Sequence, residues 1–351
     1  MSSITLFGAG SWGTALSVHL ASAGRDVVLW ARRAEVADEI RRTSHNPTYL
    51  PELLIPSSVY VTTDLETAAQ ASDVWAMAVP SQNMQARARA LSPHVHDEVR
   101  VVSLAKGIDN ETLLTMSQVL NDEFEVVPRQ QIGALSGPSH AEEVAEGRPT
   151  TVVAAAPDED EARFIQKAFM TERLRVYLNT DVLGVEIGGS LKNVLAIAAG
   201  ISDGVGYGDN AKAALVTRGL AEMRRLGYAL GADPQTFSGL SGVGDLVATC
   251  TSEHSRNRYL GEQIASGRSL DEVSEDMAMV AEGVRTTQSV FKLARQHEVD
   301  MPITEAVYAI LFEGKRPSEM VKRLMTRTAK REHWFSEPLV SDGGASEGRR
   351  R

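Results

Sequence analysis

The chain contains very little cysteine. Its 351 residues include one, Cys250, so an intrachain disulfide and a zinc site built from several cysteines are both excluded. So few thiols suit a reducing compartment, and we expect a cytoplasmic protein. The eight histidines are scattered. His94 and His96 lie in a polar linker without carboxylates at ligand spacing, so we interpret them as surface residues and expect no metal site.

The chain also lacks an excess of basic residues and long apolar runs. Lys and Arg number 36 against 46 Asp and Glu, which gives a formal net charge of −10. An acidic chain is a poor candidate for binding nucleic acid or an anionic membrane non-specifically. The apolar runs at residues 74–80 and 194–200 are much shorter than the roughly 20 residues of a membrane span, and the N-terminus has no signal-peptide pattern. We therefore expect a soluble protein without a membrane span or a nucleic-acid partner.

The chain does contain two regions of different periodicity. Short β-branched runs alternate with amphipathic stretches in the first half, which predicts a parallel α/β sheet. We expect strands at 4–7, 27–30, 74–79, 100–104, 132–136 and 151–155, and helices at 12–23, 33–43, 65–71, 84–91 and 113–121. From about Asp181 helical patterns replace strand-like runs. We therefore expect an α/β domain over residues 1–181, an all-helical domain over 182–335 and a disordered, Gly-rich tail over 336–351.

A glycine-rich segment follows the first expected strand. Gly8, Gly10 and Gly13 fit the pattern G-x-G-x-x-G, with a helix expected immediately afterwards. In this pattern the first glycine permits a tight turn, the second lets a pyrophosphate approach the backbone, and the third allows close helix–strand packing. The pyrophosphate lies at the positive end of the helix that begins near Ser11. The pattern predicts a Rossmann-like dinucleotide-binding domain.

The residues after the second expected strand indicate which dinucleotide is bound. NAD-specific sites usually carry an Asp or Glu there, whereas this chain has Arg32 and Arg33. Guanidinium groups pair well with a 2′-phosphate, although two solvated arginines at a helix start are the alternative interpretation. We favour NADP(H), with NAD(H) also accepted.

Two lysines lie in segments that we interpret as functional. Lys106 follows the strand expected at 100–104, at the sheet edge where ligands bind in open α/β folds. Lys192 follows Gly188 and Gly189 within a helix, where each glycine costs about 1 kcal/mol relative to alanine. A close neighbour or a ligand would offset that cost. A lysine desolvated there can have the lowered pKa that acid–base catalysis requires, while an exposed helical lysine is the alternative.

Further segments add polar groups. Residues 136–141 form a strand-to-helix turn, and its backbone amides could hold a polar substrate. The alternative interpretation is an ordinary turn without a ligand. The glycine-rich segment 239–246 supplies one carboxylate, Asp245. Ser255, Arg256 and Asn257 open a helix, and a helix N-terminus with an arginine is suited to phosphate. The sequence thus predicts a second anion site for a smaller phosphorylated molecule.

Taken together, these segments resemble bacterial NAD(P)-dependent glycerol-3-phosphate dehydrogenases from residue 4 to about 331. The resemblance rests on collinear motifs: residues 8–16, 106–107, 136–139, 188–193, 202–204, 210–215, 242–246, 255–257 and 280–283. The sequence departs modestly from the pattern of this family, as at His140, where phenylalanine is common. It implies reversible hydride transfer between dihydroxyacetone phosphate and sn-glycerol 3-phosphate, feeding phospholipid synthesis.

The resemblance also implies residue roles. Lys192 would be the acid–base residue, assisted by Lys106, Asp245, Asn193 and Thr249. The implied substrate-binding residues are Lys106, Gly137, Ser139, Lys192, Asp245, Ser255, Arg256 and Asn257. The implied cofactor-binding residues are Gly8, Gly10, Ser11, Trp12, Gly13, Arg32, Arg33, Lys106, Ala141, Arg256, Val280 and Glu282. For this two-domain architecture we expect a homodimer formed through the helical domain.

Three other functions are weighed against this one. A hydroxy-acid dehydrogenase of the same architecture would need residues shaped for a carboxylate, whereas residues 255–257 favour phosphate. A non-catalytic NADP-sensing protein would have no use for the lysine–aspartate set. A metal-dependent dehydrogenase would need a ligand cluster, which the scattered histidines do not provide.

Overall fold

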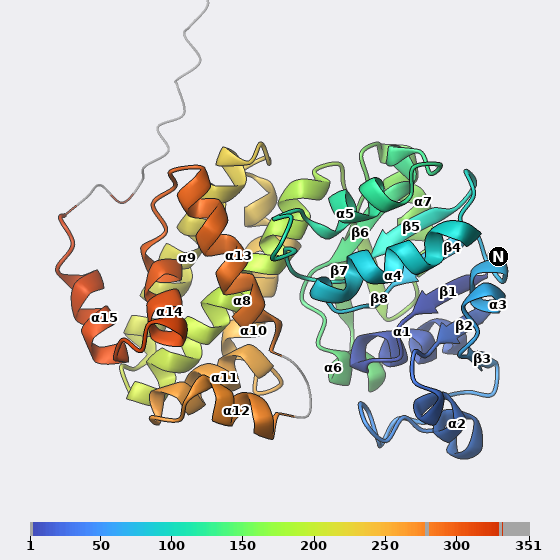
Figure 1. The fold of residues 1–351 in the computed structure, drawn as a ribbon, viewed down its shortest axis with the longest axis horizontal. Helices are drawn as coiled ribbons and strands as arrows, with labels where there is room; N and C mark the ends of the chain where they lie inside the picture. The colour runs from blue at the N-terminus through green and yellow to red at the C-terminus, as the bar shows by residue number, and fades with distance from the viewer. Residues whose placement is uncertain (1–2, 278–280, 330–331, 333–351) are drawn as a thin grey trace, which may run out of the picture.

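The computed structural model describes residues 3–277, 281–329 and 332. An α/β half and a helical half lie side by side, with helix α8 (Val182–Val205) at their junction (Figure 1). Asp181 is the N-cap of α8 and accepts a hydrogen bond from the Gly184 N–H at 2.9 Å. The disordered tail expected at 336–351 lies outside the described residues.

The α/β half contains one eight-stranded sheet with the order β3-β2-β1-β4-β5-β6-β7-β8. Its first six positions follow the order 3-2-1-4-5-6 of doubly wound dinucleotide-binding folds, in which a ligand binds at the point where the strand order reverses. That point lies between β1 and β4. The strands are β1 (Ile4–Phe7), β2 (Val27–Trp30), β3 (Val59–Thr62), β4 (Val74–Met77), β5 (Arg100–Ser103), β6 (Ile132–Ser136), β7 (Thr150–Ala155) and β8 (Leu174–Asn179).

The sheet is parallel as expected except at one edge. Strand β7 is antiparallel to β6, and β8 is parallel to β7. The short helix α6 (Ala141–Ala145) lies between β6 and β7, and this connection returns the chain without the full helical crossover that parallel strands need. The sequence analysis also missed β3 and β8, the two edge strands.

Helices cover both faces of the sheet, and an apolar core lies on each face (Figure 1). One core contains Leu16 and Ile40 from helices beside β1 and β2, and the other contains Trp75 and Phe124. The helices of this half are α1 (Ser11–Ser22), α2 (Ala34–Thr43), α3 (Leu65–Gln70), α4 (Met84–Leu91), α5 (Met116–Glu123), α6 and α7 (Glu159–Phe169).

Helix α8 forms the centre of the helical half. It is buried from Gly184 to Ser202 and contacts α9, α10, α11 and α13. Within the described ranges, α8 is the one helix long and apolar enough to cross a membrane, and 89% of its apolar window is buried in the protein. Its neighbours are α9 (Asp209–Ala229), α10 (Asp245–Thr251), α11 (Arg256–Ala265), α12 (Leu270–Asp276), α13 (Glu282–Gln296), α14 (Pro302–Phe312) and α15 (Pro317–Met325).

Helix α8 also contacts the sheet directly. Val185 packs in a small apolar cluster with Ala134, Val153 and Ala155 of β6 and β7. The neighbouring residue Glu186 is buried, and its carboxylate accepts hydrogen bonds from the backbone N–H and the hydroxyl of Ser117 on α5 at 2.9 and 2.5 Å. These contacts fix the helix that carries Lys192 against the α/β half.

Candidate active site

The glycine-rich loop has the geometry that a pyrophosphate requires. Gly8 has a φ of +127° and a Cβ there would collide with the Ala78 carbonyl after β4, while a Cβ at Gly13 would collide with the Gly8 carbonyl. By contrast, a Cβ at Gly10 would meet nothing within 4 Å. The first and third glycines therefore allow close backbone packing, and the second faces open space at the start of α1.

Basic side chains gather at the end of β2. Arg32 and Arg33 are exposed and line the same cavity as the glycine-rich loop. The Arg33 guanidinium donates a hydrogen bond to the Tyr49 hydroxyl at 3.2 Å. The guanidinium of Arg87, on α4, lies 4.2 Å from the Trp30 ring centroid and also lines the cavity. Such a group of guanidinium ions suits a phosphate on the adenosine ribose.

Three ionic side chains from distant parts of the chain meet at the other end of the cavity. The Asp245 carboxylate at the start of α10 accepts a hydrogen bond from Lys192 Nζ at 2.5 Å and from Lys106 Nζ at 2.8 Å. The side chains of Lys106, Lys192 and Asp245 are 16%, 8% and 1% exposed, respectively. An isolated buried ion is costly, so each of these charges depends on the others.

The same contacts explain the pKa shifts in this cluster. Burial lowers the pKa of the Lys192 ammonium to about 8; the Lys106 charge acts in the same direction, and Asp245 opposes both. Burial alone would raise the pKa of Asp245, but the two ammonium groups hold that pKa below its ordinary value. At neutral pH the arrangement is therefore an ionised aspartate between two lysines, one of which can release a proton in the physiological range.

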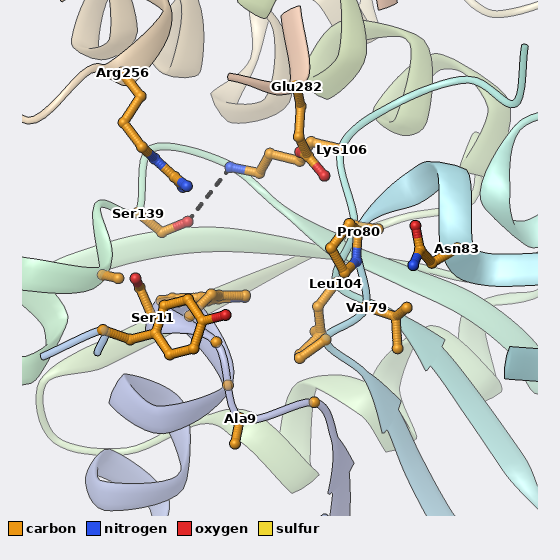
Figure 2. Close-up of a pocket in the computed structure, with 18 of the residues that line it drawn as sticks. Ala9, Ser11, Val79, Pro80, Asn83, Leu104, Lys106, Ser139, Arg256 and Glu282 are labelled. Carbon is orange, nitrogen blue, oxygen red and sulfur yellow. Dashed lines mark hydrogen bonds between the residues drawn. The ribbon is translucent and has the colours of Figure 1, made fainter. Parts of the chain in front are cut away.

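Lys106 connects this cluster to the turn after β6. Its Nζ also donates to the Gly137 carbonyl at 2.8 Å and lies 3.5 Å from Ser139 Oγ (Figure 2). Gly137 has a φ of +126°, a conformation that other residues adopt only with strain. Behind Asp245, the Thr249 hydroxyl donates to the Asp245 carbonyl at 2.7 Å. Thr249 therefore stabilises the first turn of α10.

The residues predicted to bind phosphate lie at the N-terminus of α11. Ser255 is the N-cap, and its Oγ accepts from the Arg258 N–H at 3.2 Å. Asn257 donates to Asn193 at 3.0 Å and accepts from the Gly283 N–H at 2.9 Å. Ser255 and Asn257 thus position the start of the helix beside the cavity.

Glu282 closes the cavity from the helical side. Its carboxylate accepts a hydrogen bond from the Ser81 N–H at 3.3 Å, and burial raises its pKa. Figure 2 shows Arg256, Lys106 and Glu282 on one side of the cavity, Ser11 on the other, and Ser139 between them. The remaining cofactor candidate on this loop, Val280, lies outside the described residues.

The structure brings nearly all of the predicted site residues together. Those that line the one cavity are Gly8, Gly10, Ser11, Trp12, Gly13, Arg32, Arg33, Lys106, Ser139, Ala141, Lys192, Asn193, Thr249, Ser255, Arg256, Asn257 and Glu282. Gly137 and Asp245 lie directly behind this lining and contact it through Lys106.

The sequence analysis missed other residues of the cavity. Tyr49, Arg87 and His254 line it but belong to no recognised pattern. His254 lies 6.0 Å from His140, ring centroid to ring centroid, and burial lowers the pKa of His140. The sequence gives little indication that Arg87 faces a cavity, because α4 otherwise has the composition of a surface helix. Within the described ranges no cluster of metal-ligating side chains is present.

Comparisons with known proteins agree with this geometry. Residues 3–162 match the model of the N-terminal domain of NAD-dependent glycerol-3-phosphate dehydrogenase, and residues 181–322 match that of its C-terminal domain. The chain is similar to glycerol-3-phosphate dehydrogenase [NAD(P)+] 1 of Salinibacter ruber, with 80% identity over 97% of this chain and 99% of that protein. The glycerol-3-phosphate dehydrogenase [NAD(P)+] of Chlorobium phaeobacteroides is 53% identical over 94% of this chain and 98% of that protein.

A solved structure gives the same result for the fold. The crystal structure of glycerol-3-phosphate dehydrogenase from Coxiella burnetii aligns with a TM-score of 0.89 and 37% identity, covering 93% of this chain and 99% of that one. The family resemblance and the order of a Rossmann-like domain before a helical domain are thus confirmed. The chain belongs to the NAD-dependent glycerol-3-phosphate dehydrogenase family and is an NAD(P)-dependent oxidoreductase.

Proposed function

We propose that this chain catalyses the reversible reduction of dihydroxyacetone phosphate to sn-glycerol 3-phosphate. One observation carries the proposal: a buried aspartate holds two lysines at the wall of a cavity that also contains the glycine-rich loop and the α11 N-terminus. Relatives up to 80% identical are named glycerol-3-phosphate dehydrogenases, which supports glycerol 3-phosphate as one member of the substrate pair.

The residues present fit a nicotinamide dinucleotide. Gly10 leaves open space at the α1 N-terminus for a pyrophosphate, and Arg32 and Arg33 suit the ribose end. Arg87 adds a third guanidinium in that region, which favours NADP(H) over NAD(H). When bound, the reduced cofactor supplies the hydride that C2 of the ketone accepts.

Lys192 acts as the general acid. Its ammonium gives a proton to the carbonyl oxygen while C2 gains the hydride, so the ketone becomes an alcohol and the lysine becomes neutral. The reverse reaction returns the proton to the neutral amine. A pKa of about 8 suits both directions near neutral pH, because a catalytic group works best when its pKa is close to the ambient pH.

The other members of the cluster prepare Lys192 for this step. Lys106 presents a second ammonium to the oxygen on which negative charge develops, and such charge is stabilised most strongly in a water-poor site. Asp245 orients both lysines, and Thr249 holds the turn that carries Asp245. Asn193 donates to the Lys106 carbonyl at 3.3 Å, so it positions the strand end beside the substrate.

The substrate phosphate is held at the start of α11. Arg256 provides a charge-assisted contact, and the helix N-terminus provides N–H groups and a positive dipole. Ser255 and Asn257 complete this end of the site, and the turn with Gly137 and Ser139 bounds it from the α/β half. Binding of the phosphate orients C2, so its loss would reduce turnover as well as affinity.

Several finer expectations accompany this proposal. We propose that the two domains divide at Asp181 and that Ala141 and Val280 contribute to the cofactor site. We further propose a cytoplasmic homodimer that supplies glycerol 3-phosphate for phospholipid synthesis. The single cysteine and the family membership support the compartment and the role; size determination by sedimentation tests the dimer.

The decisive assay follows the oxidation of NADPH and NADH separately in the presence of dihydroxyacetone phosphate. Unphosphorylated dihydroxyacetone and a 2-keto acid serve as matched alternative substrates. We expect rapid oxidation with dihydroxyacetone phosphate alone and a higher kcat/KM with NADPH. Equal activity toward the 2-keto acid would contradict the assignment of a phosphate site to α11.

A further inference from the structure

The segment after α2 reaches the glycine-rich loop through a buried asparagine. Asn46 is fully buried, with 0% of its surface exposed. Its Nδ2 donates a hydrogen bond to the Ala9 carbonyl at 3.0 Å and another to Thr14 Oγ1 at 2.9 Å. Ala9 lies between Gly8 and Gly10, and Thr14 lies in the first turn of α1. One side chain therefore joins the two parts of the predicted pyrophosphate site.

The amide is oriented unambiguously by its partners. The Ala9 carbonyl can only accept, so the group facing it must be the NH₂ of Asn46. In the described part of the chain, Asn46 Oδ1 is buried without a partner, and an unsatisfied buried acceptor costs about 1–3 kcal/mol. Because the unpartnered Oδ1 destabilises the fold, the two hydrogen bonds that Nδ2 donates are the reason to have an asparagine here.

The contact with Ala9 determines where the next N–H group points. The described residues contain no cis peptide bond, and in a trans peptide the C=O and N–H groups point in opposite directions. Holding the Ala9 carbonyl against Asn46 therefore turns the Gly10 N–H away from Asn46. Among the described residues this N–H has no acceptor, and Gly10 lines the cavity.

We propose that Asn46 is a positioning residue for the dinucleotide: it aims the Gly10 N–H at the pyrophosphate without touching the cofactor. The proposal rests on the proposed dinucleotide site. Because NADPH and NADH share the pyrophosphate, Asn46 contributes equally to the binding of both. It thus differs from Arg33, which lies at the ribose end and is held by Tyr49 of the same segment.

The test uses two variants and one control. Asn46→Ala removes both donors, and Asn46→Leu removes them while keeping most of the side-chain volume, so at least one folded variant is expected. Asn121→Ala is the matched control, because Asn121 on α5 also donates to a backbone carbonyl, that of Ser117 at 2.8 Å, and also has a buried, unpartnered Oδ1. Dissociation constants are measured directly on the folded proteins for NADPH, NADH, ADP-ribose and 2′-AMP.

We expect both Asn46 variants to raise the Kd of NADPH, NADH and ADP-ribose by a common factor of about ten. The Kd of 2′-AMP, which lacks the pyrophosphate, should stay within about twofold, and Asn121→Ala should leave every Kd unchanged. The inference is overturned if the Asn46 variants bind all four ligands normally, weaken NADPH alone, or weaken 2′-AMP as much as ADP-ribose. Failure of the unaltered protein to bind either NADPH or NADH would instead contradict the proposed function.

Discussion

At the scale of single residues, the chemistry depends on how one carboxylate is shared. Asp245 is 1% exposed and accepts from two lysines, so it is ionised where a lone carboxylate would be disfavoured. Its carboxylate orients both lysines. The Asp245 charge also opposes the effect of burial on Lys192, whose pKa is about 8. Changes at these residues should therefore affect proton transfer more than folding.

Replacing Lys192 tests most directly whether the cluster acts in proton transfer rather than in folding. Lys192→Ala should fold and bind NADPH, but its kcat should fall by about 10²–10⁴, the usual contribution of a general acid. Steady-state kinetics and direct cofactor titration measure the two effects. Lys212→Ala is the control, because Lys212 is also paired with an aspartate, Asp203 at 2.7 Å, but does not line the cavity. Near-normal turnover of Lys192→Ala would remove this residue from the mechanism.

The pKa of Lys192 also predicts a pH dependence with a defined sign. Ketone reduction uses the protonated amine, so its kcat/KM should fall as pH rises through about 8. Alcohol oxidation uses the neutral amine and should rise over the same interval. Initial rates in both directions between pH 6 and 10 would show the crossing. Parallel profiles in the two directions would contradict the assignment.

Single residues also show what could be predicted from the sequence. That the glycine-rich loop and Arg32 and Arg33 share one cavity was predictable, because their positions after β1 and β2 place them at the same edge of the sheet. Lys106, Lys192 and Asp245 come from distant segments, and only the family resemblance joined them before the structure was known. Asn46 and Arg87 escaped notice because each acts through packing partners that no local pattern reveals.

At the scale of elements, α8 packs against both halves of the molecule and carries Lys192, the proposed general acid. A Cβ on Gly188 would collide with the Ser241 carbonyl, and one on Gly189 would approach Ser136 Oγ. The two glycines therefore let α8 lie directly against the segment that precedes Asp245 and against the end of β6. From the helical cost of glycine, we expected either a close neighbour or a ligand at these positions, and the structure shows close neighbours.

Gly188→Ala should reveal the importance of that contact. Alanine would gain about 1 kcal/mol of helix propensity, but overpacking in a tight interface costs about 1–3 kcal/mol. We expect a net loss of unfolding free energy and a lower kcat, because α8 would shift away from Asp245. Urea unfolding and kinetics measure both. A more stable and fully active variant would show that the contact tolerates a methyl group.

A second buried carboxylate stabilises α14. Glu222 on α9 accepts from the Ile303 N–H at 2.6 Å, the Thr304 N–H at 3.1 Å and the Thr304 hydroxyl at 3.0 Å. Burial raises its pKa from 4.5 to about 7, although these hydrogen bonds act in the opposite direction. The folded protein thus binds a proton at Glu222 that the unfolded chain releases above about pH 4.5.

The sign of this linkage gives a stability prediction. The stability that the proton at Glu222 contributes is fully present below about pH 4.5 and is lost as pH rises to about 7. Glu222→Gln cannot titrate, so its free energy of unfolding should lack that decrease. Urea unfolding of both proteins at pH 5, 6, 7 and 8 measures the difference. The free energy of unfolding of the unaltered protein minus that of Glu222→Gln should be larger at pH 5 than at pH 8. A difference that does not change with pH would contradict the linkage to Glu222.

Element boundaries were predictable where periodicity was strong. The start of α8 and all six expected strands were placed within a few residues of their observed bounds. Strand β8 was missed because Arg175 and Tyr177 on its exposed face break up the apolar run. The antiparallel direction of β7 could not be predicted, because strand direction depends on the whole connection and leaves no mark on the strand's own sequence.

At the scale of the whole molecule, the charge of the exterior differs from that of the cavity. The chain carries a net charge of −10, yet six lysines and arginines line the cavity that contains the glycine-rich loop: Arg32, Arg33, Arg87, Lys106, Lys192 and Arg256. Anionic ligands are therefore attracted by a local field, because exposed charges more than about 8 Å away are largely screened at physiological salt.

The effect of the local charge can be tested at Arg32 and Arg33, which we propose to bind the adenosine ribose of the cofactor. Combining Arg32→Ala with Arg33→Ala should raise the Kd of NADPH about 10–100-fold and change that of NADH much less, because charge-assisted bonds to the 2′-phosphate are lost. Combining Arg41→Ala with Arg42→Ala is the matched control. It removes the same charge from α2, where both arginines are paired with acidic neighbours. Equal losses for NADPH and NADH would defeat the cofactor assignment.

The hydrogen bond between Asn193 and Asn257 has a consequence for engineering. It connects α8, which carries Lys192, to the N-terminus of α11, where we propose that the substrate phosphate binds. Retargeting the enzyme to a carboxylate substrate by rebuilding residues 255–257 would remove a partner of Asn193, and with it a support for Lys106. A new specificity would therefore have to be selected together with compensating changes on α8.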